Sequence, residues 1–174
     1  MSSVRHGAAP RRGLLVLFAC LLVGAAGAAE LSAVTAHPPP AAAGTPLDRM
    51  LAGLAGRPVL INFWASWCEP CREELPALQQ LGNHWRGQRL AVVTVAVADQ
   101  RARVDEFLAA HVIELPVIDD REQQISRAWG VRLLPTTLVL DHRHRIRLRG
   151  QGAIDWESAA VGERLRGVLE RTRR

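Results

Sequence analysis

The sequence predicts an α/β fold whose central mixed sheet has a parallel βαβ half and an antiparallel hairpin, with helices on both faces. Two continuous apolar runs, 58–65 and 90–98, flank a segment with helical spacing, which is the order of a right-handed parallel crossover. Two further strand-like runs, 135–141 and 145–152, are joined by only three residues, as in a hairpin. Segments with helical spacing also precede, separate and follow these strands.

The first 29 residues are typical of an export segment rather than of a folded domain. Three arginines precede an apolar run from Leu14 to Ala29, and the run ends in small side chains. A membrane-spanning helix needs about 20 apolar residues, so this run is short for that role. We therefore predict that residues 1–29 are a signal peptide cleaved after Ala28 or Ala29, with an uncleaved N-terminal membrane anchor as the alternative.

The remaining chain divides into a linker and one domain. Residues 30–45 are rich in proline and alanine and show no apolar period, so we expect a flexible spacer there. Residues 46–174 are predicted to form a single domain, because a chain of this length suits one core. The elements expected in it are helix 47–56, strand 58–65, helix 69–85, strand 90–98, helix 101–111, strand 115–120, helix 122–130, strands 135–141 and 145–152, and helix 156–171.

The charge of the chain does not indicate a nucleic-acid partner. All 22 basic residues are arginine, against 17 acidic residues, and residues 1–29 hold three of these arginines and no acid, so the remainder carries only +2. In the second hairpin strand, Ile146 and Leu148 alternate with arginines, which predicts one buried and one solvated face. Because no aromatic residue interleaves with these arginines to stack on bases, we expect no nucleic acid.

The cysteine count excludes the common metal centres. Cys20 lies in the predicted signal peptide, which leaves only Cys68 and Cys71 in the exported domain. A zinc site or an iron–sulfur cluster needs about four protein ligands, and the histidines are scattered along the chain. We therefore expect no metal and no separate cofactor. A purely structural disulfide is disfavoured, because so short a loop constrains the unfolded chain little.

The spacing and position of Cys68 and Cys71 favour a redox pair. At the start of a helix, free N–H groups and the positive end of the helix dipole stabilise a thiolate, so Cys68 is the candidate nucleophile. Cys71, one turn further on, can reach the same sulfur and resolve a mixed disulfide. Pro70 suits the first turn of a helix, where its missing N–H is not needed. Glu69 opposes thiolate formation at Cys68, and this favours the pair as an electron donor.

The segment INFWASWCEPCREELPAL resembles the active-site segment of the thioredoxin-like TlpA/ResA/CcmG group of exported bacterial thiol-disulfide oxidoreductases. Its CEPC form is especially similar to ResA. The resemblance extends over about Leu47–Leu169, with VTVAVAD, AWGVRLLPTTLVLD and GAIDWES as further matching segments, and it implies a thioredoxin-like fold. The chain lacks the CxxxC-plus-histidine arrangement of Sco-type copper chaperones and the threonine-rich peroxidatic motif of the peroxiredoxins.

The resemblance also assigns roles to residues outside the cysteine pair. Pro135 matches the cis-proline loop that supplies backbone for an incoming peptide, with Leu134 and Thr136 as its neighbours in the client-binding loop. Glu74 matches an acidic residue that lies near the cysteines and helps to set their proton transfers. Without the resemblance, Glu74 would be interpreted as a solvent-facing helix residue. Trp67 is expected to shield the disulfide.

The function implied by the resemblance is that of an exported protein-disulfide reductase. In this group, electrons come from a membrane thiol carrier of the DsbD or CcdA type, and the clients are apocytochrome c CxxCH cysteines or copper-site cysteines. We expect a monomer in the periplasm or at the extracytoplasmic face of the bacterial inner membrane. Two alternatives stay open: an exported disulfide oxidase or isomerase, and a copper-binding assembly chaperone that uses both thiolates.

Overall fold

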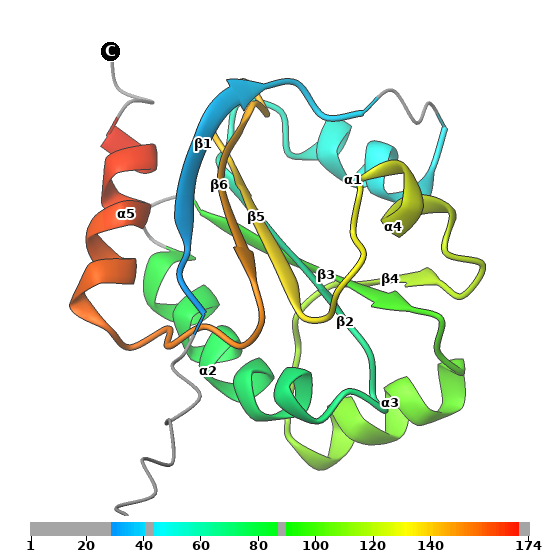
Figure 1. The fold of residues 1–174 in the computed structure, drawn as a ribbon. Coiled ribbons are helices and arrows are strands. Elements are labelled where there is room, and N and C mark those ends of the chain that lie inside the picture. Colours follow the sequence, from blue (N-terminus) through cyan, green and yellow to red (C-terminus); the bar gives the residue numbers. More distant parts are fainter. Residues whose placement is uncertain (1–28, 41–43, 87–89, 171–174) are drawn as a thin grey trace, which may run out of the picture.

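A computed structural model of the chain describes residues 29–40, 44–86 and 90–170, and these residues contain one six-stranded sheet. Its strands are β1 Ser32–His37, β2 Val59–Trp64, β3 Ala91–Val97, β4 Val117–Asp120, β5 Thr136–Leu140 and β6 Ile146–Gln151. Their order in the sheet is β1-β6-β5-β2-β3-β4 (Figure 1). β2, β3 and β4 run parallel, while β5 and β6 form an antiparallel hairpin next to β2. The predicted mixed sheet is confirmed.

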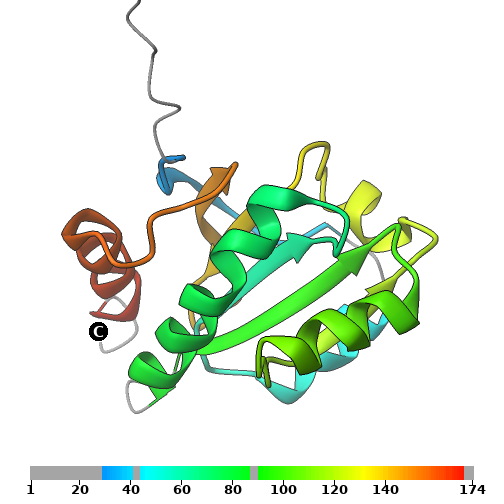
Figure 2. The ribbon, with the colours of Figure 1, turned by 90° about the horizontal axis from the view of Figure 1, so that it is seen from below.

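Helices of the described residues cover both faces of this sheet, as predicted (Figures 1 and 2). They are α1 Pro46–Gly53, α2 Glu69–Trp85, α3 Arg101–Ala110, α4 Gln124–Ala128 and α5 Ala159–Glu170. Apolar residues of α2, α3 and α5 pack together with one face of the sheet, and those of α1 and α4 pack with the other. The sheet therefore separates two hydrophobic cores. α2 belongs to the larger of them, which we call the α2 core.

β2 is the strand that leads into the cysteine pair. It is paired with β3 on one side and β5 on the other, and all of its residues are buried. Successive side chains of a strand point to opposite faces, so Leu60, Asn62 and Trp64 share one face. Because Leu60 and Trp64 belong to the α2 core, Asn62 also points toward α2. Burial on both faces explains why the sequence of β2 is almost continuously apolar.

Several helices are shorter than the sequence predicts: α1 ends at Gly53 rather than at residue 56, and α4 and α5 begin later than expected. Gln123, just before α4, has a positive φ of 57°, and the Asp120 carboxylate accepts hydrogen bonds from N–H groups in the first turn of this helix. Both features fix the beginning of α4 after residue 122. α5 begins at Ala159 rather than at Trp156, because Ser158 caps it: the Ser158 hydroxyl accepts a hydrogen bond from the N–H of Val161 at 3.4 Å.

The expected flexible spacer over 30–45 is wrong for its first part. Ser32–His37 forms β1, which pairs antiparallel with β6 and covers the edge that β6 would otherwise expose. Leu31, just before β1, has 0% of its surface exposed and belongs to the α2 core. A strand of small residues shows little apolar periodicity of its own, and its partner lies more than 100 residues away along the chain.

Leu31→Ala is expected to lower the free energy of unfolding by about 2–4 kcal/mol, because it removes a fully buried side chain from the core. Urea denaturation of the full chain measures this loss. Thr35→Ala is the matched control: Thr35 is exposed on the same strand, and its replacement should change stability by less than about 0.5 kcal/mol. If Leu31→Ala were as neutral as the control, the segment would be a spacer after all.

The pairing of β6 with β5 contains an irregularity that the sequence does not reveal. Leu140 pairs with Ile146 and its neighbour Val139 pairs with Leu148, so Arg147 is an extra residue in β6. Ile146 and Leu148 are both buried, as predicted, but they lie in different cores. The predicted alternation of buried residues with more exposed arginines is confirmed, but the buried side chains do not share one face, because the extra residue turns Ile146 to the α1 and α4 side.

The predicted signal peptide or anchor lies outside the described residues except for Ala29. The N–H of Ala29 donates to the carbonyl of Ala153 at 2.7 Å, and Ala29 forms an isolated parallel bridge with Ile154. Within the described ranges, no helix is both long and apolar enough to cross a membrane. Whether the leader is cleaved or retained stays a prediction.

Candidate active site

Cys68 and Cys71 are joined by a disulfide at the N-terminal end of α2. Cys68 is the N-cap residue, and its carbonyl accepts hydrogen bonds from the N–H groups of Cys71 and Arg72. The two Cα atoms are 5.3 Å apart. Cys68 keeps 7% of its surface exposed, whereas Cys71 has 0% exposed. A second protein can therefore approach the disulfide from the Cys68 side.

The loop between β2 and Cys68 is held by Asp99, the second residue after the end of β3. The Asp99 carboxylate accepts hydrogen bonds from both the N–H and the hydroxyl of Ser66, the latter at 3.0 Å. It also accepts one from the N–H of Gln100 at 2.7 Å. The Trp67 indole N–H donates to the carbonyl of Ala98 at 3.2 Å. The two residues before Cys68 are thus tied to the end of the neighbouring strand.

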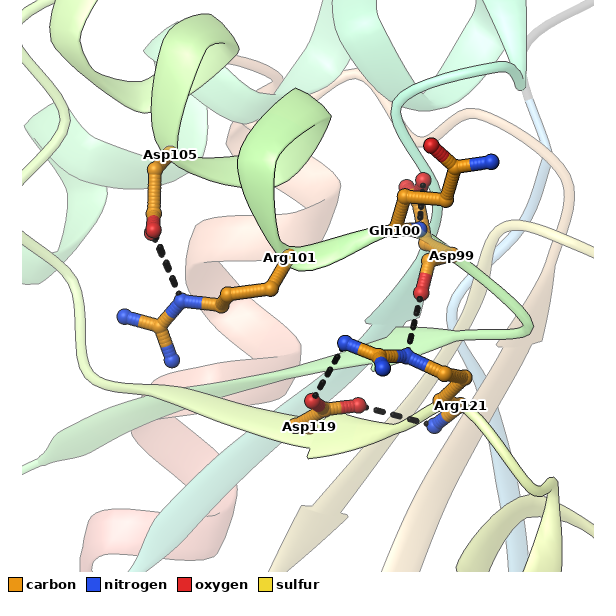
Figure 3. A network of polar contacts seen from close by, with 6 residues as sticks. All are labelled: Asp99, Gln100, Arg101, Asp105, Asp119 and Arg121. Atoms are coloured by element: carbon orange, nitrogen blue, oxygen red, sulfur yellow. Dashed lines mark hydrogen bonds and ion pairs between the residues drawn. The ribbon is translucent and has the colours of Figure 1, made fainter.

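Figure 3 shows the polar contacts around Asp99, the residue that holds the loop before Cys68. Arg121 donates to the backbone carbonyl of Asp99 and pairs with Asp119, with both contacts at 3.4 Å. Arg101 pairs with Asp105 at 2.8 Å on the surface of α3. The charged side chains of both ion pairs are about half exposed, so solvent screens each pair and its contribution to stability is small.

Glu74 is buried one helical turn after Cys71, on the side of α2 that faces the sheet. Its Oε1 accepts a hydrogen bond from Asn62 Nδ2 at 2.8 Å, and its Oε2 accepts one from the backbone N–H of Ile154 at 2.9 Å. Burial raises the pKa of Glu74 from 4.5 to about 7, although these hydrogen bonds oppose the shift. Glu74 can therefore gain or lose a proton near neutral pH.

The loop before β5 lies next to the end of β2. The peptide bond between Leu134 and Pro135 is cis, and Thr136 pairs with Phe63 near the end of β2. The Thr136 hydroxyl donates to the carbonyl of Leu133 at 2.6 Å, which closes the turn. Leu133 and Trp67 are two of the large apolar side chains that stay more than half exposed among the described residues. One precedes the cis-proline and the other precedes Cys68.

Glu69 is exposed and forms an ion pair with Arg72 at 3.3 Å. The Arg72 guanidinium also lies over the Phe107 ring, 5.6 Å from its centroid. The negative charge that Glu69 places beside Cys68 is therefore partly balanced by a neighbouring positive charge. Its predicted effect on the electron affinity of the pair is smaller than the sequence alone indicates.

No group of three or more His, Cys, Asp or Glu side chains in the described ranges is arranged to hold a metal ion. The two sulfur atoms themselves store two electrons when the disulfide is reduced, so the chemistry of this site requires no added group.

Residues 42–149, more than half of the chain, match the AhpC/TSA family. The chain belongs to the AhpC/TSA family. The resemblance to the thioredoxin-like TlpA/ResA/CcmG group is confirmed by relatives named ResA and by a solved structure named DsbE.

Among the AhpC/TSA relatives, the thiol-disulfide oxidoreductase ResA of Bacillus subtilis is 32% identical over 96 residues, which is 55% of this chain and 54% of ResA. The chain spans about half the length of the curated relatives it matches. A Chlorobium tepidum protein assigned as thiol:disulfide interchange protein DsbE is 29% identical, with a TM-score of 0.64 over 68% of this chain and 84% of DsbE. A thioredoxin-family thiol:disulfide interchange protein from Chlorobium tepidum TLS shares the fold, with a TM-score of 0.65 over 79% of this chain and 99% of that protein at 24% identity.

The residues of the site are predictable from the sequence, but the contacts that support them are not. Asn62, Asp99 and Ile154 hold the site, and none of them is predicted. Asn62 had a detectable signal, because it is the polar residue in the otherwise apolar run 59–64 and a buried amide needs a partner. Ile154 acts through its backbone N–H, which no side-chain pattern reveals.

Proposed function

We propose that this chain is an exported thiol-disulfide oxidoreductase that reduces disulfides in client proteins. The observation that carries the proposal is the disulfide at the start of α2, in which Cys68 keeps 7% of its surface exposed and Cys71 is fully buried. This asymmetry suits a pair in which one sulfur meets the client and the other acts only on the first.

In the proposed reaction, the reduced protein starts with Cys68 as a thiolate and Cys71 as a thiol. The Cys68 sulfur attacks one sulfur of a client disulfide, so that a mixed disulfide forms and the client's other sulfur leaves as a thiolate and takes a proton. Cys71 then loses its proton and attacks the Cys68 sulfur, which breaks the mixed disulfide and frees the second client sulfur. The client gains two electrons from the pair and two protons, one released by Cys71 and one from the solvent, and Cys68 and Cys71 end as a disulfide.

Glu74 is the proposed acceptor of the Cys71 proton. It lies one helical turn away from Cys71, and a pKa of about 7 lets its carboxylate take up a proton at neutral pH and release it again. The loop Leu134–Thr136 is the proposed client-binding loop, with Pro135 beside the disulfide and Trp67 shielding it. Glu69 and Pro70 complete the helix start and tune the electron affinity of the pair.

The proposal places the protein in the periplasm or at the extracytoplasmic face of the inner membrane, where it acts as a monomer. A membrane thiol carrier of the DsbD or CcdA type then supplies the two electrons that restore the reduced pair. The proposed clients are the CxxCH cysteines of apocytochrome c or the cysteines of a copper site.

The direction of electron flow is tested by the reduction potential of the Cys68 and Cys71 pair, measured in glutathione or dithiothreitol buffers, together with insulin reduction. A reductase is expected to have a potential below about −220 mV and to reduce insulin. A potential near about −120 mV, typical of strong oxidants, would instead assign the protein to disulfide formation. Tight copper binding without any disulfide exchange would favour the chaperone alternative.

A further inference from the structure

We propose that Asn62 is a positioning residue for the reaction, because its side-chain amide holds the Glu74 carboxylate in place for proton transfer. The inference rests on the proposed function and adds a residue to it. Asn62 does not touch the sulfur atoms in the contacts described above, so it would act through Glu74.

The geometry around Asn62 holds its amide on two sides. Nδ2 donates to Glu74 Oε1 at 2.8 Å and to Thr137 Oγ1 at 3.0 Å. Thr137 lies directly opposite Asn62 in the pairing of β2 with β5, two residues after Pro135. Asn62 is fully buried, so neither bond competes with solvent. One amide nitrogen therefore links the Glu74 carboxylate to the strand that follows the proline loop.

A purely structural role does not explain an asparagine at this position. Asn62 Oδ1 is buried and has no hydrogen-bond partner among the described residues. An unsatisfied buried oxygen destabilises the fold, whereas an apolar residue in the middle of β2 would continue the core. The compensating feature is the bond to Glu74, whose other oxygen already accepts from Ile154. Each carboxylate oxygen thus has a donor, one from β2 and one from the segment after β6.

The amide of Asn62 favours the ionised form of Glu74, because it donates to an oxygen that carries negative charge. Without this donor, burial opposes ionisation with less compensation, and the pKa of Glu74 rises further. Losing one hydrogen bond to a buried charged group shifts the pKa of that group by about one pH unit.

The test follows Glu74 directly, by the pH dependence of its side-chain carboxyl ¹³C chemical shift in the oxidised full chain. Asn62→Leu is expected to raise the titration midpoint by about one pH unit. Asn62→Ser is the second variant, because the serine side chain is too short for its hydroxyl to reach Glu74 and is small enough to avoid overpacking. Thr94→Val is the matched control: Thr94 is equally buried, pairs with Asn62 on β3, and donates to the carbonyl of Pro116 instead.

Unchanged midpoints in both Asn62 variants, or an equal shift in Thr94→Val, would overturn the positioning role. The pH profile of insulin reduction provides the second readout, and its midpoint should move together with the Glu74 titration. A profile that stays in place while the titration moves would also contradict the inference. If neither the wild type nor any variant reduces a disulfide, the proposed function fails. The shifted titration would still identify Asn62 as the residue that holds Glu74.

Discussion

Replacing Cys68 by serine is expected to lower the rate of disulfide reduction at least about a thousandfold. Serine has nearly the same shape, but its hydroxyl is not ionised at neutral pH, and its oxygen does not form the mixed disulfide that both steps require. The remaining Cys71 is fully buried and meets no client. The rate is measured by mixing the reduced full chain with a fluorescent disulfide peptide and following its cleavage.

Cys71→Ser serves as the matched variant because it keeps the nucleophile and removes only the resolving sulfur. It is expected to accumulate a mixed disulfide, seen by mass spectrometry as the protein plus one client. Adding dithiothreitol should release the client. The assignment of the nucleophile would be wrong if Cys68→Ser formed this adduct and Cys71→Ser did not.

The stability of the oxidised protein is expected to fall with rising pH because of Glu74. Burial raises the pKa of this carboxyl to about 7 in the folded protein, against 4.5 for the ordinary group. Between these values the folded state binds a proton that the unfolded state does not, so folding is favoured at low pH. This contribution is complete below pH 4.5 and is lost as the pH rises through 7. It amounts to about 3 kcal/mol.

Glu74→Gln removes this titration, so its free energy of unfolding should depend less steeply on pH. The difference between wild type and Glu74→Gln is expected to change by about 3 kcal/mol between pH 4 and pH 8 in urea denaturation. Glu73→Gln is the control, because Glu73 is the adjacent residue and is exposed on the same helix. Parallel pH curves for wild type and Glu74→Gln would show that Glu74 does not titrate near neutrality.

The parts of the fold that were predicted correctly are those whose signal lies within one segment. β2 and β3 are buried on both faces and therefore read as continuous apolar runs, and the bounds of α2 agree with its helical spacing. β1 was missed because its six residues are small and only partly buried. The irregularity in β6 was missed because the pairing with β5, rather than the alternation within β6, decides which core receives each side chain.

The candidate site also has features that the sequence predicts and features that only the tertiary structure decides. The family, the Cys68 and Cys71 pair, and its place at the start of a helix follow from the sequence, because they depend on neighbouring residues and their spacing. The environment of Glu74 was decided only by the tertiary structure. Its carboxylate meets an amide 12 residues earlier and a backbone N–H 80 residues later. A buried charge takes its pKa from such distant partners and from the solvent they exclude, and no local pattern records them.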